Sequence, residues 1–292
     1  MTLPVSLRTS SAFSFLSAAS LPEDLARIAG DLGLEAVALA DADGVYGVPR
    51  FVKAAREAGV RPIVGASVRV DFGPDAGGTP AAGDESCGRL VLLCEDLAGW
   101  QNLCELLTEA HRGRAKGEAL VDPALIERFR GGLVGLAGGL RGPVLAAAVR
   151  SGPDAAARVA QHLAGALGPG HFFLDLQRHG DPRDEHGNRL LRDLSAGLRL
   201  PLVAATDVRY ATPDRGPVLD VLQALRHKTT LDGMGRALPR THRHHLLPPA
   251  DQGRLFADEP RAVANARDLG DRLRFSLSDL GYAFPRFPDP QG

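Results

Sequence analysis

Two aspartates separated by one residue form the first pattern in this sequence that could do chemistry. Asp41 and Asp43 follow a short apolar run, 36–39, and precede an amphipathic run, 49–58. This order predicts a strand, an acidic turn and a helix, and in α/β folds the loop after a strand commonly carries function. Two carboxylates there indicate a metal or phosphate site. The residue between them is Ala42, which has no ligand atom, whereas a metal site favours an imidazole or carboxylate.

Further polar side chains follow other apolar runs of the chain. A barrel of parallel strands would bring all of them to one rim. The set contains three acids, two histidines, two arginines and two serines: Arg8, Ser10, Asp41, Asp43, Ser67, His111, His179, Asp207 and Arg209. We take this set as the candidate functional site.

Short apolar strands alternating with amphipathic helices must position that set. The strands are expected at 5–7, 36–40, 62–70, 89–94, 132–137, 172–176 and 201–205. The helices are expected at 21–32, 49–58, 100–110, 122–129, 141–150, 154–167, 186–198 and 214–226, with Ser20 and Asp122 as N-caps. This alternation predicts parallel βαβ units. Seven strands without a glycine-rich dinucleotide fingerprint favour a closed α/β barrel, and an open doubly wound sheet is the alternative.

The composition limits the class of protein further. The chain has 292 residues, 44% of them hydrophobic, and a net charge of −1, so no global basic field attracts it to nucleic acid or a membrane. No apolar run approaches the ~20 residues needed to span a bilayer, and no signal peptide is evident, so we expect a cytoplasmic protein. Residues 72–88 predict a surface loop, and the helical pattern fades after residue 229.

Several segments together resemble a known family. Residues 7–16 (LRTSSAFSFL) and 41–47 (DADGVYG) resemble the first two motifs of the polymerase and histidinol phosphatase (PHP) domain. The version of this domain in the alpha subunit of bacterial DNA polymerase III is the more similar one. Four more segments match this domain in kind: 61–66, 99–104, 176–180 and 203–210. The end of the chain, 274–285, resembles the error-prone branch of that subunit. The resemblance implies a distorted, TIM-like (β/α)7 barrel that in intact members holds up to three metal ions for phosphoester hydrolysis.

The resemblance also implies that most of the metal ligands are lost here. The family has His, His, His, Glu and His where this chain has Arg8, Ser10, Ala42, Ser67 and Arg209. Four vestigial ligand positions keep their residue type: Asp41, His111, His179 and Asp207. Each divalent ion needs about four to six ligands, so we expect no metal cluster and no catalytic residues.

The function implied by the resemblance is that of a catalytically inactive PHP domain. It would serve as a structural platform for DNA polymerase domains, or would bind replication or translesion-repair proteins. The expected boundaries are a barrel over 1–275 and a Pro- and aromatic-rich linker over 276–292, which would lead to a palm domain absent from this chain. Two alternatives stay open: a residual phosphoesterase or exonuclease using Zn, Mn or Mg, and an accessory DNA-binding module.

Two features of the candidate site give structural expectations. Arg8 and Arg209 replace imidazoles by guanidiniums, whose planar forks suit carboxylates. We therefore expect them to pair with Asp41, Asp43 or Asp207 in place of the lost cations. The histidine-rich tract 242–245 is expected to be a solvated loop, because its spacing provides no ordered pair of metal ligands.

The charge pattern yields a first prediction. Because the chain is nearly neutral and shows no basic stripe, its binding to DNA should be weak and should fall steeply as salt rises. Fluorescence anisotropy with labelled single- and double-stranded oligonucleotides would measure this. Sub-micromolar binding at physiological salt would instead support the DNA-binding alternative.

Overall fold

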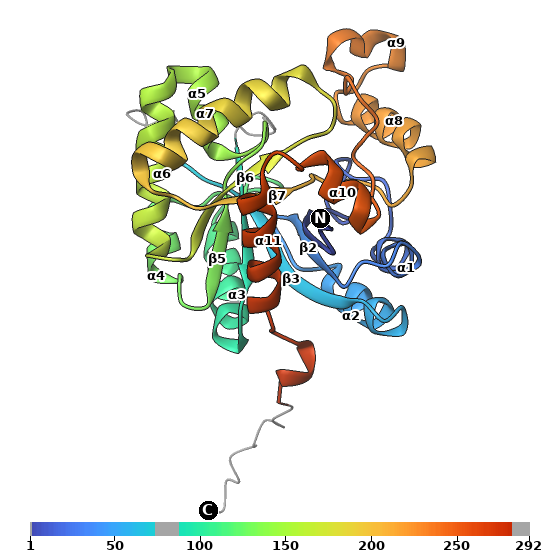
Figure 1. Ribbon diagram of the computed structural model, residues 1–292, viewed down its shortest axis with the longest axis horizontal. Coiled ribbons are helices and arrows are strands. Elements are labelled where there is room, and N and C mark those ends of the chain that lie inside the picture. The colour runs from blue at the N-terminus through green and yellow to red at the C-terminus, as the bar shows by residue number, and fades with distance from the viewer. Residues whose placement is uncertain (1, 74–87, 282–292) are drawn as a thin grey trace, which may run out of the picture.

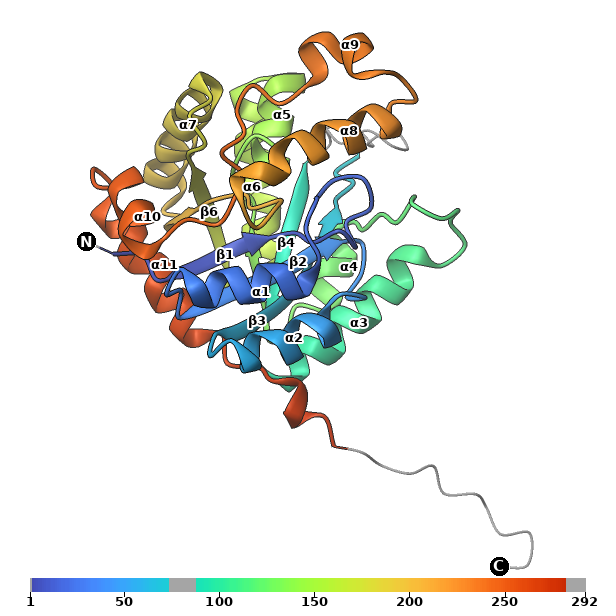
Figure 2. The same ribbon diagram turned by 90° about the vertical axis from the view of Figure 1, so that its right-hand side faces the viewer.

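The computed structural model describes residues 2–73 and 88–281, in which seven strands form one nearly closed barrel (Figures 1 and 2). In order around the sheet the strands are β1 (Val5–Thr9), β2 (Ala36–Ala42), β3 (Arg61–Arg69), β4 (Arg89–Cys94), β5 (Leu133–Leu136), β6 (Phe172–Gln177) and β7 (Leu202–Ala205). Beyond the end of β7, the Val208 N–H donates to the Arg8 carbonyl at 3.0 Å, and the Ser10 N–H donates to the Val208 carbonyl at 2.9 Å. These bonds bring the two edges together, so the expected barrel is confirmed.

The strand β4 departs from the expected parallel arrangement. It is antiparallel to both β3 and β5, so the prediction of parallel pairs throughout is wrong for this strand. Parallel neighbours need a crossover, usually a helix, and the sequence between 70 and 89 predicts none. Because β4 is reversed, α3 (Leu97–His111) runs back along the barrel and brings its last residue, His111, to the rim.

The remaining helices surround the barrel, as Figures 1 and 2 show. They are α1 (Pro22–Asp31), α2 (Val48–Glu57), α4 (Pro123–Arg128), α5 (Pro143–Ser151), α6 (Pro153–Leu167), α7 (Pro182–Leu198), α8 (Gly216–Arg226), α9 (Leu231–Met234), α10 (Pro249–Leu255) and α11 (Pro260–Arg272). Asp122 caps α4 as expected, since its Oδ1 accepts from the Leu125 N–H at 2.7 Å. Ser20 does not cap α1, because its hydroxyl accepts from the Ala211 N–H instead. Within the described ranges, none of the helices combines the length and apolar character that crossing a membrane requires.

The helices after residue 229 were not anticipated by the sequence analysis. The buried side chains of α11 follow a helical period: Ala262, Val263, Ala266 and Leu269. This face packs against β1 and β7. Arg61 at the start of β3 donates to the carbonyls of Leu273 and Gly270 at 2.7 and 2.8 Å and so fixes the end of the helix. Part of the expected linker also contacts the barrel domain, since the Arg56 guanidinium donates to Ser276 and Ser278.

Residues 282–292 of the expected linker and most of the expected loop at 72–88 lie outside the described residues.

One glycine marks the close approach of two strands. Gly65 of β3 lies opposite Leu93 of β4, and a Cβ at residue 65 would lie 2.2 Å from the carbonyl oxygen of Leu92. Only a residue without a side chain fits between these backbones. Gly165 in α6 offers a contrast, because a Cβ there would meet no atom within 4 Å.

This contrast predicts opposite effects of the same substitution. Gly65→Ala should lower the free energy of unfolding by roughly 1–3 kcal/mol, since the backbones of β3 and β4 would have to separate. Gly165→Ala should raise it by about 0.5–1 kcal/mol, because alanine favours a helix interior over glycine. Urea unfolding followed by circular dichroism would measure both. Equal effects of the two substitutions would contradict this account of the β3–β4 pair.

Candidate functional site

A guanidinium lies at the centre of the barrel mouth. Arg8 is carried by β1, and its side chain is only 5% exposed. Its Nη1 donates to Asp175 Oδ2 at 3.2 Å, and its Nε donates to Asp207 Oδ1 at 3.3 Å. Arg8 therefore joins β1 to a carboxylate of β6 and to one that follows β7.

Asp207 receives more than one cation. Arg209 Nε donates to its Oδ2 at 3.1 Å, and Arg141 Nη1 lies 3.9 Å from the same oxygen. Burial alone would raise the pKa of Asp207, but Arg209, Arg8 and Arg141 hold the pKa well below its usual range. The predicted pairing of Arg8 and Arg209 with a rim aspartate is thus confirmed for Asp207.

Asp41 has a different environment, in which its hydrogen bonds from the described residues come from serines. Its Oδ1 accepts from the Ser11 N–H at 2.6 Å and from the Ser14 hydroxyl at 2.7 Å, and its Oδ2 accepts from the Ser11 hydroxyl at 2.7 Å. Burial raises the pKa of Asp41, although the bonds from the two serines oppose this shift. Of the three aspartates expected as alternative partners of Arg8 and Arg209, Asp207 is the one that both arginines bond, and Asp41 is held by serines instead.

Asp43 is paired, but with an arginine that the sequence analysis did not single out. Arg89 of β4 donates to both carboxylate oxygens, at 3.0 and 2.9 Å. The backbone of Asp43 has a φ of 55°, and its carbonyl oxygen lies 2.7 Å from His111 Nε2. A carbonyl oxygen only accepts, so this nitrogen of His111 carries the proton.

Two stacked histidines support the backbone of Asp207. The Asp207 N–H donates to His179 Nε2 at 2.9 Å, which places the proton of a neutral His179 on Nδ1, 3.4 Å from Asp184 Oδ2. The ring of His244 lies 4.2 Å from that of His179, and its Nδ1 donates to the Asp207 carbonyl at 2.9 Å. Burial, together with Arg209, holds the pKa of His244 well below its usual value. The expectation of a solvated tract at 242–245 is wrong for His244.

Five of the nine vestigial positions surround one small hollow inside the mouth. Arg8, Ser10, Ala42, Ser67 and Asp207 line it, and its volume is about 20 Å3. Such a volume has room for about one water molecule. The other four positions lie around it: His179 and Arg209 contact Asp207, Asp41 is held by serines, and His111 contacts Asp43.

The ligand-type side chains do not converge. Among residues 2–73 and 88–281 there is no group of three or more His, Cys, Asp and Glu side chains placed to hold a metal ion. The two aspartates at ligand positions are instead engaged separately, Asp41 by hydroxyls and Asp207 by guanidiniums.

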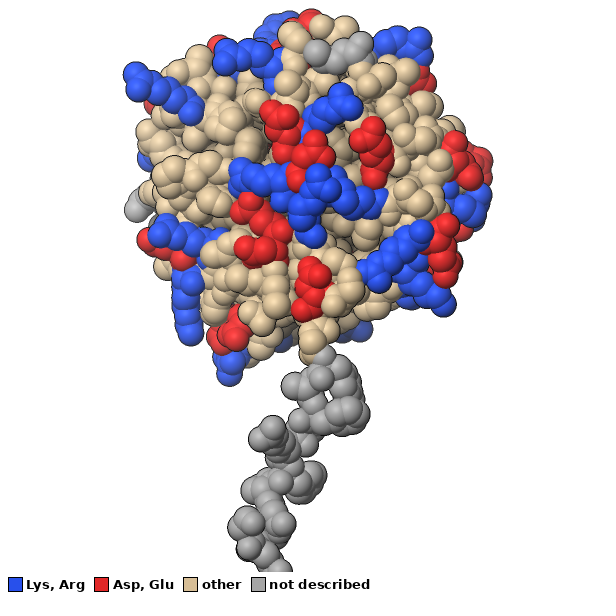
Figure 3. Space-filling view, turned by 60° about the horizontal axis from the view of Figure 1, so that its bottom comes forward, with Lys and Arg blue, Asp and Glu red and all other residues tan. Residues whose placement is uncertain are grey.

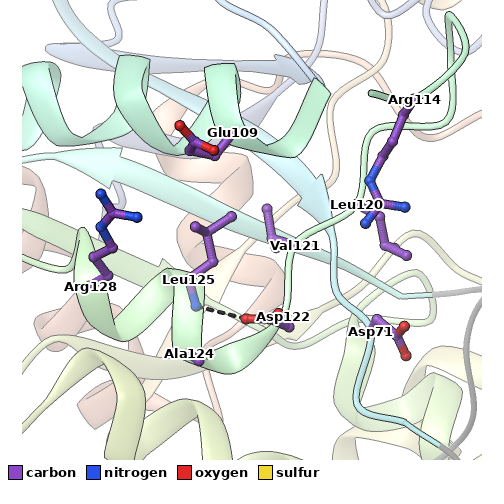
Figure 4. Close-up of a pocket in the computed structure, with 9 residues that line it drawn as sticks. All are labelled: Asp71, Glu109, Arg114, Leu120, Val121, Asp122, Ala124, Leu125 and Arg128. Carbon is purple, nitrogen blue, oxygen red and sulfur yellow. Dashed lines mark hydrogen bonds between the residues drawn. The ribbon is translucent and has the colours of Figure 1, made fainter. Parts of the chain in front are cut away.

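A second hollow lies away from the vestigial positions, between α3 and α4 (Figure 4). Its volume is about 420 Å3, and its charged lining mixes both signs, with Asp71, Glu109 and Asp122 beside Arg114 and Arg128. Glu109 already pairs with Arg112, and Asp122 caps α4, as the dashed line in Figure 4 shows. These engaged acids give the hollow no evident chemistry.

Several residues of the mouth were missed from the sequence. They are Ser11, Ser14, Arg89, Arg141, Asp175 and His244. Asp175 did carry a signal, because it is a charged residue within the apolar run of β6 and is fully buried. A buried charge requires a partner, so its position could have indicated an arginine opposite.

Comparison with known proteins identifies relatives over nearly the whole chain. A family model described as the PHP domain matches residues 6–179, which confirms the resemblance seen in the sequence. The error-prone DNA polymerase of Mycolicibacterium paratuberculosis is 36% identical over 288 residues, 98% of this chain and 26% of that protein. The error-prone DNA polymerase of Symbiobacterium thermophilum is 32% identical over 304 residues, 99% of this chain and 27% of that protein. The chain thus spans about a quarter of the length of these relatives.

Solved structures show the same fold at low sequence identity. An amidohydrolase from Chromobacterium violaceum, solved with bound sulfate and no metal, superposes with a TM-score of 0.50. The match has 12% sequence identity and covers 71% of this chain and 88% of the amidohydrolase. At this identity the likeness concerns the fold alone.

The burial of Arg8 predicts a large loss of stability when its side chain is removed. Arg8→Ala would leave Asp175 and Asp207 buried with fewer cations, which should lower the free energy of unfolding by roughly 3–5 kcal/mol. Arg112→Ala is the control, because Arg112 is 68% exposed in its pair with Glu109, and such pairs contribute about 0–1 kcal/mol. Chemical denaturation of both variants measures the difference. Similar losses would mean that Arg8 is not a structural cation.

Proposed function

Because this chain belongs to the PHP domain family and is homologous to part of the error-prone DNA polymerases, we propose that it is a non-hydrolytic PHP module of such a polymerase. Its role would be structural: to hold polymerase domains, or to bind a protein of replication or translesion repair. This role places it in the bacterial cytoplasm. DNA synthesis itself would belong to the portion of the relatives that this chain does not cover.

The observation that carries the proposal is the engagement of Asp207. Both of its oxygens are taken by guanidiniums, Oδ1 by Arg8 and Oδ2 by Arg209. A divalent ion at this carboxylate would have to displace at least one of these cations, which are part of the chain. Hydrolysis by two metals also needs ions ~3.5–4 Å apart that clamp the attacking and leaving oxygens. The mouth instead has its positive charges fixed in place by arginine.

The charge on the face shown in Figure 3 supports a role in protein contacts more than in DNA binding. On the face shown in Figure 3, Lys and Arg lie among Asp and Glu rather than in a patch of one sign. Charged side chains of the described residues also pair locally, for example Arg272 with Glu95 and Arg274 with Asp271. A DNA-binding face would need a stretch of unbalanced positive charge along the phosphate backbone.

The proposal predicts that the purified chain holds no stoichiometric Zn, Mn or Fe. Elemental analysis after gel filtration measures the metal content, and hydrolysis of a chromogenic phosphodiester with added Mn or Zn measures activity. We expect neither bound metal nor activity above that of buffer. Tightly held ions, together with an activity that Asp207→Ala abolishes, would instead establish the residual phosphoesterase.

A further inference from the structure

Helix α8 carries apolar residues on two faces. Its inner face, with Leu219 and Ala224, is buried. A second set follows a helical spacing on the outer face, and we call it the outer stripe: Val218, Val221, Leu222 and Leu225. Val218, Val221 and Leu225 are 39%, 45% and 59% exposed. A surface helix normally has one apolar stripe, whereas a helix that is apolar on both faces is normally covered on both. The outer stripe is therefore a candidate for the contact surface of a partner.

An exposed phenylalanine is attached to the last turn of α8. Phe15, in the loop after β1, is 79% exposed. The Arg226 guanidinium donates to the carbonyl of Phe15 at 3.4 Å and to the hydroxyl of Ser17 at 2.7 Å. Gln223 donates to the carbonyl of Leu16 at 2.8 Å, and Leu16 has a φ of 60°, which is uncommon for a residue with a side chain. Side chains of α8 thus hold the loop in the conformation that exposes Phe15.

A single exposed apolar residue would not carry this argument, because such residues are common on protein surfaces. Val149 of α5 is an example. It is 87% exposed, but it is followed by the exposed polar residues Arg150 and Ser151, and Leu145 one turn before it is buried. The outer stripe and Phe15 differ from Val149 because several exposed apolar side chains belong to one helix and the loop bonded to it.

Positive charge gathers at one end of the outer stripe. Residues 226–228 are Arg, His and Lys in succession, and Lys228 is exposed and forms no ion pair with the described residues. Asp220, the acid within α8, is only 15% exposed and pairs with a histidine at 2.9 Å. At the other end of the helix the exposed charges, Asp214 and Arg215, have opposite signs. A partner that covers the stripe would therefore gain from carboxylates placed near Lys228.

The position of α8 favours a separate protein over a segment that directly continues the chain. Both views show α8 and α9 at the end of the molecule away from η4 (Leu277–Asp279), the last described element (Figures 1 and 2). A segment directly following η4 would start on the opposite side from the outer stripe.

The charges of α8 also disfavour a second copy of the chain as the partner. If two α8 helices paired antiparallel about the centre of the outer stripe, Arg215 of each copy would lie opposite Lys228 of the other. In a parallel pair, residues 226–228 of the two copies would meet. Both arrangements bring like charges together, which opposes association.

From the outer stripe, Phe15 and the basic end of α8, we infer that this surface docks an amphipathic helix of a partner protein, one with carboxylates beside its apolar face. A helix with apolar residues at i, i+3, i+4 and i+7 presents the surface that packs on such a stripe. The inference rests on the proposed function and specifies where the partner binds and what chemistry it presents.

Fluorescence anisotropy with a labelled synthetic peptide tests the surface. The probe has about 18 residues, because shorter isolated helices are marginal in water. It carries Leu at the i, i+3, i+4 and i+7 positions with Glu beside them, and a twin peptide carries Lys in place of Glu. The Glu peptide should bind roughly three- to fivefold more tightly than the Lys peptide, since exposed ion pairs contribute modestly.

Three variants locate the binding on the chain. Leu225→Asp should weaken binding of the Glu peptide at least about tenfold, because it places a carboxylate within the apolar contact. Lys228→Glu should abolish the preference for the Glu peptide over the Lys peptide. Val149→Asp is the matched control, an exposed apolar residue replaced by the same acid away from α8, and should leave binding unchanged. Circular dichroism checks that all three variants fold.

The remaining outcomes each overturn a defined statement. Equal binding of the two peptides would overturn the acidic partner, and equal weakening by Leu225→Asp and Val149→Asp would overturn the location. A concentration-dependent dimer in sedimentation velocity that Leu225→Asp abolishes would assign the surface to a second copy instead. Absence of peptide binding in a chain without metal or hydrolysis would overturn this inference alone. Metal-dependent hydrolysis would overturn the proposed function, whatever the peptides do.

Discussion

The mouth of this barrel depends on one cation that is part of the chain. Arg8 contacts Asp175 and Asp207 at once, and so ties the first strand to the two strands that close the barrel. In a metal site the corresponding charge would come from solution, and its occupancy would vary with metal supply and with chelators. A guanidinium cannot dissociate and keeps its charge at every physiological pH. The link that Arg8 makes between Asp175 and Asp207 therefore does not depend on metal supply.

The arrangement of the acids follows from how each is compensated. Asp207 is buried among guanidiniums, which favour its charged form. Asp41 is buried among hydroxyls, and its pKa moves the other way. The two aspartates are thus separate structural groups in the described residues, one ionic and one hydrogen-bonded.

The barrel and most of its helices could be predicted from the sequence, because apolar periodicity and strand length are local signals. The reversal of β4 could not, since strand direction depends on how the chain returns, and that is a tertiary property. The pairing of Arg8 and Arg209 with an aspartate was predictable because the resemblance implies that both occupy ligand positions of the family. The partner of Asp43 was harder to predict. Asp43 pairs with Arg89 of β4, and the spacing of these two residues in the sequence does not link them. Likewise, α11 was missed although its apolar period is regular, because the region around it gives weaker signals.

The reversed strand has a consequence for how this rim tolerates change. In the sector of β4, two side chains reach the mouth: Arg89 at the start of the strand, and His111, the last residue of a fifteen-residue helix. Each residue of a helix turns by about 100° and rises by about 1.5 Å. One insertion or deletion within α3 would therefore swing His111 away from the carbonyl of Asp43, whereas a similar change in a surface loop would be absorbed. The length of α3 is fixed by a contact at its far end.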